Sequence, residues 1–247
     1  MKEWIYSRYA VYETLRARRR QVFSLLVAEG AQEKGRLAEI QRMAAEFRVR
    51  PERVNRARLD NLASGHQGVA LEVEPYPYAN LVDILELAAD RREDPFILIL
   101  DTLQDPQNLA TLLRTAEICG VHGVLLPLRH TVSVTPAVVN ASSGASEHLL
   151  IAQANLAQAI AELKERGVWV AGLEGSPESQ DIETFRMNGP LALVVGSEGD
   201  GMRLLVRKSC DVLVRLEMVG QIESLNAAVA GSIALYLARQ ARILKRA

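Results

Sequence analysis

The sequence has few cysteines and no long apolar run, and both absences exclude broad classes of protein. Only two of the 247 residues are cysteines, Cys119 and Cys210. Each lies in an apolar context without CxxC or Cys/His spacing, so we expect two reduced core thiols and neither a disulfide nor a metal site. No apolar stretch approaches the length of a membrane-spanning helix. The first residues lack the apolar core of a signal peptide, which predicts a cytoplasmic protein.

The net charge of −1 is divided unevenly along the chain. Residues 1–74 hold 14 Lys and Arg against 10 Asp and Glu, whereas the remaining residues hold 15 against 20. A basic N-terminal part indicates a surface that faces a polyanion such as RNA. The alternative is a solvated helix end whose cations interact favourably with the helix dipole. The densest stretch is "RARRR", and its candidate RNA-binding residues are Arg16, Arg18, Arg19 and Arg20.

Helical and strand patterns alternate in two series, with a proline-rich break between them. Residues 1–74 predict a small α/β unit. Prolines in "EPYPYANL" restrict the backbone, so we interpret residues 75–92 as a linker and lead-in helix. In residues 93–247, strands alternate with helices and begin with "PFILILD", an apolar run typical of a strand buried on both faces. This order predicts an α/β fold with a mostly parallel sheet covered on both faces.

Polar or glycine-rich segments follow three of the predicted strands, and ligands of parallel sheets gather at such strand ends. The first segment is "DPQNLATLLRTAEICGV", residues 105–121. Its Asn108 is expected to cap a helix, and its Arg114 stands beside an apolar stripe. Taken alone, this pattern favours ordinary capping with a snorkelling surface arginine over a binding site.

The second segment is "LALVVGSEGDGM", residues 191–202, in which Glu198 lies among Gly196, Gly199 and Gly201. Glycines there permit positive φ and a close approach of a ligand to the backbone. The spacing is G-x-x-G-x-G, which is not the dinucleotide fingerprint, and no phosphate-loop lysine follows. Nucleotide-binding enzymes of the two usual kinds are therefore disfavoured. The alternative is a tight strand-to-helix turn.

The third segment is "RLEMVGQIESLNAAVAGSIALYLAR", residues 215–239. Ser224 is expected to cap the following helix, and Asn226 falls in its first turn. Small residues from Ala227 to Gly231 make that helix thin. A thin helix face is most often a device for close packing, and that is the alternative to a binding site.

Together, "NLATLLR", "VVGSEGDGM" and "LEMVGQIESLNAAVA" resemble the three motifs of the SpoU (TrmH-type) RNA 2′-O-ribose methyltransferases of the SPOUT superfamily. The resemblance covers roughly residues 95–242. The preceding unit, with "HQGVAL" at residues 66–71, resembles the L30e-like substrate-binding domain of many members. Similarity over the whole chain is closest to the bacterial members that methylate a guanosine of 23S ribosomal RNA.

The resemblance implies content that the residue patterns alone do not carry. It implies a C-terminal trefoil knot, S-adenosyl-L-methionine as cofactor, RNA as partner, no metal, and a homodimer with sites at the subunit interface. The cofactor would be held around Gly196, Leu216, Met218 and Leu225. The implied catalytic and RNA-contacting positions are Asn108, Arg114, Glu198, Ser224 and Asn226. Arg114 would activate the ribose hydroxyl, either as a base or as a cation that clamps a phosphate.

Three positions depart from the family pattern, and two other functions stay open. Glu217 replaces a proline beside the cofactor loop, Asn140 replaces a lysine that could contact RNA, and Ser7 replaces a common glycine. The first alternative function is methylation of a transfer-RNA guanosine by the same chemistry. The second is a non-catalytic RNA-binding protein of ribosome assembly.

Overall fold

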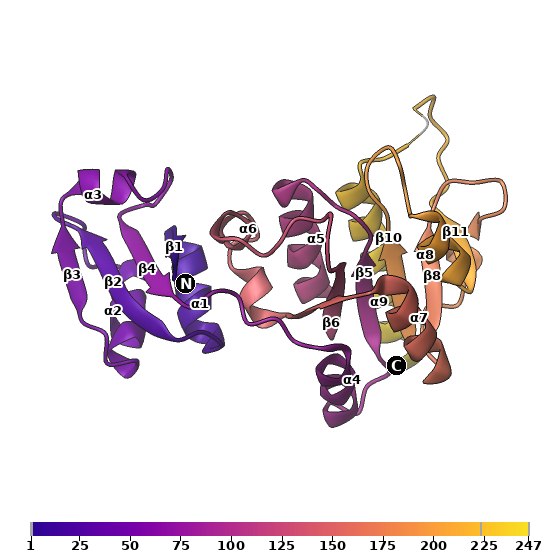
Figure 1. Cartoon of the computed structure of the whole chain (residues 1–247), viewed down its shortest axis with the longest axis horizontal. Helices are drawn as coiled ribbons and strands as arrows, with labels where there is room; N and C mark the ends of the chain where they lie inside the picture. The colour runs from indigo at the N-terminus through magenta and orange to yellow at the C-terminus, as the bar shows by residue number, and fades with distance from the viewer. Residues whose placement is uncertain (1, 223, 247) are drawn as a thin grey trace. The chain divides into compact units, whose positions relative to one another are not determined.

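The computed structural model describes residues 2–222 and 224–246, which fall into two compact units (Figure 1). The N-terminal unit consists of residues 1–77 and 133–148, and the C-terminal unit of residues 78–132 and 149–247. Each unit has its own sheet. The units therefore differ from the predicted consecutive domains in one respect, because residues 133–148 belong with the N-terminal part of the chain.

The N-terminal unit is built on a four-stranded sheet in the order β1-β4-β2-β3. Its strands are β1 (Glu3–Tyr6), β2 (Val22–Ala28), β3 (Pro51–Val54) and β4 (Val69–Val73). β4 pairs antiparallel with β1 and β2, and β2 pairs parallel with β3. The helices are α1 (Arg8–Ala17), α2 (Arg36–Glu46), α3 (Arg56–Asp60), α6 (Pro136–Ala141) and the 3₁₀ turn η1 (Ala145–His148). α6 and η1 pack against α1, and α6 also packs against β1, which explains why residues 133–148 join this unit.

The C-terminal unit is built on a seven-stranded sheet in the order β7-β6-β5-β10-β8-β11-β9. Every neighbouring pair in it is parallel, which confirms the predicted sheet type. The strands are β5 (Phe96–Leu100), β6 (Gly123–Pro127), β7 (Leu150–Ala154), β8 (Trp169–Leu173), β9 (Gln180–Asp181), β10 (Leu191–Val195) and β11 (Val212–Arg215). Because all strands are parallel, their carboxyl ends lie at one edge of the sheet.

Helices cover both faces of this sheet, as the alternating pattern predicts. α4 (Leu81–Asp90), α7 (Leu156–Glu165) and α8 (Leu204–Ser209) share one buried cluster with alternate residues of β5 and β10. α5 (Pro106–Cys119) and α9 (Ala227–Arg246) pack side by side on the other face (Figure 1). A Cβ atom on Gly231 would lie 2.6 Å from Leu112 Cδ2 and 3.1 Å from Val195 Cγ2. The small residues of α9 thus serve close packing.

Two of the predicted helix caps are wrong. Asp105 caps α5 by accepting from the Gln107 amide at 2.9 Å, because Pro106 has no N–H and fits the first helical position. Asn108 therefore lies inside the first turn. α9 begins at Ala227, so its cap is Asn226 and not Ser224.

Both cysteines are free, with Cys119 buried and Cys210 partly buried. Burial, followed by the neighbouring Asp211, raises the pKa of the Cys210 thiol to about 12. None of the helices within the described residues has the length and apolarity to cross a membrane. The same residues contain no group of three His, Cys, Asp or Glu side chains that could hold a metal ion.

Candidate active site

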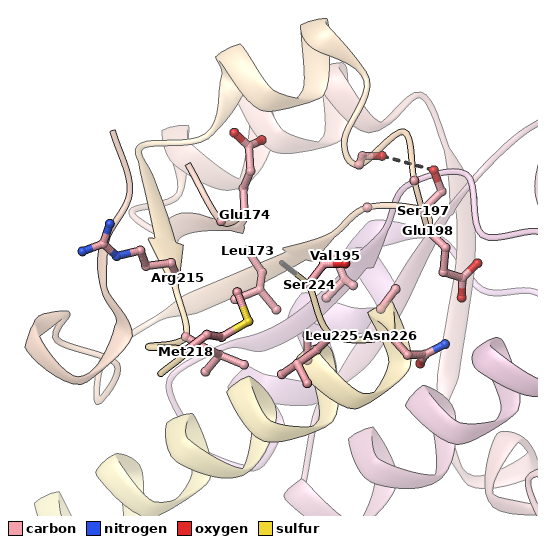
Figure 2. Close-up of a pocket in the computed structure, with 17 residues that line it drawn as sticks. Leu173, Glu174, Val195, Ser197, Glu198, Arg215, Met218, Ser224, Leu225 and Asn226 are labelled. Carbon is pink, nitrogen blue, oxygen red and sulfur yellow. Dashed lines mark hydrogen bonds between the residues drawn. The ribbon is translucent and has the colours of Figure 1, made fainter. Parts of the chain in front are cut away.

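A pocket of about 440 Å³ lies in the C-terminal unit at the carboxyl ends of β8, β10 and β11 (Figure 2). Three stretches line it: residues 173–175 after β8, residues 195–201 after β10, and parts of residues 215–230 that lead from β11 into α9. This is the sheet edge at which the sequence predicts a ligand site. The volume falls in the range of small-molecule sites, about 300–1,000 Å³.

A tight glycine turn forms one wall of the pocket. Gly199 and Gly201 have φ angles of +87° and +66°, a region that favours glycine. The amides of Ser197 and Gly201 each donate to the other's carbonyl, at 3.0 and 3.1 Å. A Cβ atom on Gly196 would lie 2.3–2.6 Å from backbone atoms of Gly201 and Met202. The turn's own backbone therefore leaves no room for a side chain at Gly196, whether or not a ligand is bound.

A buried carboxylate fixes the position of that turn. Asp101, at the end of β5, is fully buried. It accepts from the Arg203 amide at 2.8 Å and from the Arg203 guanidinium at 2.8 and 2.7 Å. Because Arg203 directly follows the glycine turn, this ion pair holds the turn against β5. No motif in the sequence marks either residue for this role.

A chain of hydrogen bonds joins the three predicted motifs at the mouth of the pocket. Asn108 Nδ2 donates to Glu198 Oε1, and Asn108 Oδ1 accepts from Asn226 Nδ2 at 3.2 Å. Asn226 Oδ1 in turn accepts from the first amides of α9, those of Ala228 at 2.9 Å and Val229 at 3.2 Å. The side chains of α5, the glycine turn and α9 are thus held in one arrangement.

The floor of the pocket is apolar and its rim is charged. Leu173 and Val195, at two strand ends, lie close to Met218 and Leu225 from the stretch before α9 (Figure 2). Glu174 lines the rim and accepts twice from Arg207 Nε, at 2.9 and 3.0 Å. All four residues predicted to bind the cofactor line the pocket, namely Gly196, Leu216, Met218 and Leu225. Glu198, Ser224 and Asn226 line it as well.

Arg114 is separate from this group. It is exposed on α5, and the residues that line the pocket do not include it. Six residues separate it from Asn108, which corresponds to about 9 Å along the helix axis. Within one chain, Glu198, Ser224 and Asn226 line the pocket, and Asn108 is hydrogen-bonded to Glu198 and Asn226, whereas Arg114 is not among the lining residues.

Glu217 lies outside the pocket as well. It lines a neighbouring hollow of about 420 Å³ with Asp181 and Glu183, on the β9 side of the sheet. The departure from the family's proline therefore adds a carboxylate to this acidic hollow. Asn140, the second departure, is a partly buried residue of α6 in the N-terminal unit.

The predicted RNA contact of Arg20 is corrected by its burial. The side chains of Arg20 and Glu147 are both 0% exposed and form a two-pronged ion pair, with N···O distances of 2.8 and 2.7 Å. Arg20 also reaches Glu3 at 3.0 Å and the Glu74 carbonyl at 3.1 Å. With its donors engaged inside the N-terminal unit, Arg20 has no surface for a phosphate. Its role is structural.

The other three arginines of "RARRR" differ in exposure. Arg19 is partly buried and donates to the Tyr76 hydroxyl at 2.8 Å, while burial raises the pKa of Tyr76 to about 12. Arg16 and Arg18 are exposed, with ion pairs to Glu13 and Glu46 respectively. Only Arg16 and Arg18 present cations at the surface.

Several pocket residues were not predicted, and one rule could have found some of them. Leu173 and Val195 are the last residues of β8 and β10, so the strand-end rule that selected Gly196 applies to them equally. Glu174 and Arg215 line the pocket without any motif that marks them in the sequence.

Two family models match the chain. The SpoU rRNA Methylase family matches residues 95–236, and the RNA 2′-O ribose methyltransferase substrate-binding family matches residues 4–79. YacO of Bacillus subtilis (strain 168), assigned to the TrmH family of tRNA/rRNA methyltransferases, is 42% identical over 236 residues, 95% of this chain and 94% of its own. A relative from Staphylococcus haemolyticus, assigned to the same family, is 40% identical over 234 residues, 94% of this chain and 93% of its own.

Solved structures share the fold at lower identity. The SpoU methyltransferase AviRb from Streptomyces viridochromogenes, in complex with AdoMet, has a TM-score of 0.83 and 23% identity over 98% of this chain and 91% of its own. An AdoMet-bound rRNA methyltransferase from Sinorhizobium meliloti has a TM-score of 0.78 and 23% identity, covering 97% and 87%. The TrmH/SpoU tRNA-modifying enzyme of A. aeolicus has a TM-score of 0.57 and 25% identity, covering 67% and 82%.

Proposed function

The chain belongs to the SpoU rRNA methylase family, and from this premise we propose that it methylates a guanosine 2′-hydroxyl in 23S ribosomal RNA with S-adenosyl-L-methionine. One observation carries the proposal beyond family membership. Asn108, Glu198 and Asn226, from three distant segments, are hydrogen-bonded to one another at the mouth of the pocket. This convergence of polar side chains beside the pocket supports a catalytic site over a non-catalytic scaffold.

The pocket fits the proposed cofactor. Its apolar floor, formed by Leu173, Val195 and Leu225, suits a purine ring, and the backbone groups of the glycine turn provide hydrogen-bond partners. AviRb and the Sinorhizobium enzyme, whose structures contain AdoMet, share the fold. When bound, the cofactor supplies an electrophilic methyl group on a sulfonium.

The chain's own residues would orient the ribose and help remove its proton. An in-line methyl transfer depends mainly on the alignment of the two reactants and on loss of the hydroxyl proton. Asn108 and Glu198 would orient the ribose at the pocket mouth, and Ser224 and Asn226 would contact the target nucleotide. Arg114 would lower the pKa of the hydroxyl as a cation or accept its proton, and the choice between these roles is left to experiment.

We propose that the protein works as a homodimer whose pockets lie at the subunit interface. Val229, Ile233 and Tyr236 are 46%, 40% and 56% exposed and form one stripe on α9, and Ile118 of the adjoining α5 is 68% exposed. In the proposed dimer, Arg114 of one copy would reach the pocket of the other. Mixing Arg114→Ala and Glu198→Ala proteins should then restore part of the activity that each lacks alone.

Two further elements of the proposal rest on the family resemblance. The return of the chain from β11 past the strand ends to α9 would form the trefoil knot. The N-terminal unit would bind a part of the RNA other than the target nucleotide, through Arg16 and Arg18. We expect the protein to act in the cytoplasm, where ribosomal RNA is modified.

Transfer RNA is the second candidate substrate, because the full-length relatives are assigned to a family that acts on either RNA. The A. aeolicus tRNA-modifying structure covers only 67% of this chain, which favours an additional substrate contact and hence the larger RNA.

Mapping 2′-O-methyl groups in total RNA from cells with and without the protein tests the proposal. We expect one guanosine of 23S ribosomal RNA to lose its methyl group, and to regain it with the purified protein and S-adenosyl-L-methionine. If a transfer RNA loses the methyl group instead, transfer RNA is the substrate and the proposed target is wrong. If no RNA loses a methyl group, the non-catalytic alternative gains and the proposal fails.

A further inference from the structure

A second hollow, the outer groove, lies at the carboxyl ends of β6 and β7, away from the pocket. It has a volume of about 500 Å³ and is lined by residues 127–130, residues 154–157, and Arg203, Leu205 and Val206. All of these residues belong to the C-terminal unit. None of them was singled out by the sequence analysis or takes part in the proposed chemistry.

A smaller hollow of about 230 Å³ lies between the outer groove and the active-site pocket and shares lining residues with both. Ser197 and Gly201 line both the pocket and the connecting hollow. His130 and Arg203 line both the connecting hollow and the outer groove. A path therefore runs along the sheet edge from the reacting site, past the ends of β10 and β5, to the ends of β6 and β7.

The loop that carries Arg129 and His130 is anchored beside the catalytic segment. Thr131 Oγ1 and the Val132 amide both donate to the Leu103 carbonyl, at 3.0 and 2.8 Å. Leu103 is itself fully buried in the stretch that leads from β5 to Asn108. Arg129 and His130 are thus presented from a fixed loop.

The outer groove is electropositive. Arg129 and His130 are exposed, and among the described residues neither side chain has a hydrogen bond or an ion pair. The amino end of α7 lines the same groove, and its helix dipole adds positive potential. No Asp or Glu is among the residues that line it. Asp200 is the one carboxylate that lines the connecting hollow.

The opposite side of the pocket has the reverse charge. There the hollow on the β9 side is lined by Glu183, Glu217 and Asp181, the last of which is paired with Arg215 at 2.8 Å. A polyanion that enters the pocket is repelled from this side and attracted to the outer groove. Leu128 and Leu205, 64% and 66% exposed, add apolar surface beside the cations, which suits the faces of unstacked bases.

We propose that the RNA strand adjoining the target nucleotide lies along this path, with one of its phosphates bound by Arg129 and His130 in the outer groove. The proposal rests on the RNA-methylating function argued above. It gives the C-terminal unit its own substrate contact, independent of the N-terminal unit. Single-stranded RNA is the occupant because a cationic groove with apolar surface matches both its backbone and its bases.

The test uses the full-length protein with S-adenosyl-L-methionine and unmodified 23S ribosomal RNA transcribed in vitro. Arg129→Ala should raise the KM for RNA about tenfold, the effect of one charge-assisted hydrogen bond, and leave kcat and cofactor affinity unchanged. The slope of log affinity against log salt should become shallower by about 0.7–0.9 for each RNA phosphate that the variant no longer neutralises. Arg129→Lys should keep most of the affinity.

The matched control is Arg186→Ala. Arg186 is an exposed arginine that precedes β10 in the chain and lines neither the pocket nor the outer groove. Within the described part of the chain, its side chain donates to the neutral Asn188 alone, at 2.9 Å. Its removal should change neither the KM nor the salt slope. An Arg129→Ala/His130→Ala protein with wild-type values for both would overturn the proposal. So would a defect seen with ribosomal particles but not with naked RNA, because it would point to a protein partner.

This test distinguishes failure of the groove proposal from failure of the proposed substrate. Wild-type protein that methylates transfer RNA and not 23S RNA overturns the proposed target, and the same variants are then measured with transfer RNA. Wild-type protein that methylates 23S RNA, beside groove variants with an unchanged KM, leaves the function intact and overturns the groove.

Discussion

Asn226 Nδ2 donates to Asn108 Oδ1 at 3.2 Å, across 118 residues of sequence. The same Asn226 side chain caps α9 through its Oδ1, and Asn108 passes the connection on to Glu198. One amide therefore serves two purposes, since its oxygen begins a helix and its nitrogen fixes a side chain at the pocket mouth. The two purposes can be separated by mutation.

Asn226→Asp should separate them. Aspartate caps a helix as well as asparagine does, so the melting temperature should change little. Its carboxylate cannot donate to Asn108 Oδ1, so the connection to Glu198 is broken and kcat should fall at least about tenfold. Asn226→Ala should break the connection and also remove about 1 kcal/mol of stability. Thermal unfolding and single-turnover methyl transfer measure the two effects.

Asn80→Asp is the control for this pair of variants. Asn80 caps α4 in the same unit by accepting from the Asp83 amide at 3.0 Å, and it does not line the pocket. The Asn80→Asp substitution should leave kcat unchanged. If Asn226→Asp is as active as Asn80→Asp, the hydrogen bond to Asn108 has no part in catalysis.

Arg114 should be required for turnover and dispensable for cofactor binding. If Arg114 activates the hydroxyl as proposed, Arg114→Ala should reduce kcat by about 100-fold or more. The Kd for S-adenosyl-L-methionine should be retained, because Arg114 does not line the pocket. Arg114→Lys distinguishes the two roles, since lysine keeps the positive charge but not the planar fork. Calorimetry and single-turnover assays measure both quantities. Near-wild-type turnover in both variants would remove Arg114 from the mechanism.

Breaking the Arg20–Glu147 pair should destabilise the N-terminal unit strongly. Each partner is 0% exposed, so Arg20→Met leaves Glu147 as an uncompensated buried charge, at a cost of about 3–5 kcal/mol. Glu147→Leu leaves Arg20 with Glu3 as its remaining ion-pair partner and should cost less. The double substitution removes both charges and should recover most of that stability. Urea unfolding of the wild type, the two single variants and the double variant gives the coupling energy. Single variants as stable as the double variant would contradict the role of this pair in joining residues 133–148 to the unit.

The same pair illustrates what the sequence could and could not predict. Strand-and-helix alternation predicts the parallel sheet, because hydrophobic periodicity depends on neighbouring residues. The pairing of Arg20 with Glu147 joins residues 127 positions apart, and nothing in "RARRR" distinguishes a buried arginine from an exposed one. The density of positive charge therefore predicted four RNA-binding arginines, of which the fold exposes two, Arg16 and Arg18.

The residues that line the candidate site were predicted more completely than the exposure of the basic residues. The site residues lie at strand ends and in motifs that the family shares, so position along the chain marks them. Arg203 and Arg129 could not be found in this way, because their importance depends on a buried Asp101 and on the shape of a groove. Such features exist only once the chain has folded.

Ser7→Gly should stabilise the protein. Ser7 has φ 72° and ψ 149°, a backbone region that is close to glycine-only and costs about 1–3 kcal/mol for other residues. Its side chain makes no capping bond to α1, so removal of the hydroxyl costs little. After the greater entropy of glycine in the unfolded chain is subtracted, we expect a gain of about 1 kcal/mol. Ser7→Ala is the control and should give no gain.

Stability should fall on mild acidification because of His122. This side chain is 1% exposed, accepts from the Phe96 amide at Nδ1 (3.0 Å) and meets Glu93 at Nε2 (3.1 Å). Burial lowers the pKa of His122, an effect that Glu93 only partly opposes. In the unfolded chain His122 takes up a proton near its ordinary pKa of about 6.5, whereas in the folded protein it stays neutral to a lower pH. The free energy of unfolding is therefore full above that pH and falls as the pH drops below it.

His122→Asn tests this assignment, because the Asn Oδ1 can accept from Phe96 in place of Nδ1 and cannot titrate. Urea unfolding between pH 7.5 and pH 5.5 should show a smaller decrease in stability for His122→Asn than for the wild type. The exposed His130, replaced in the same way, should leave the wild-type decrease unchanged. An equal decrease in all three proteins would assign the pH dependence to carboxylates, because a buried neutral imidazole could then contribute nothing to it.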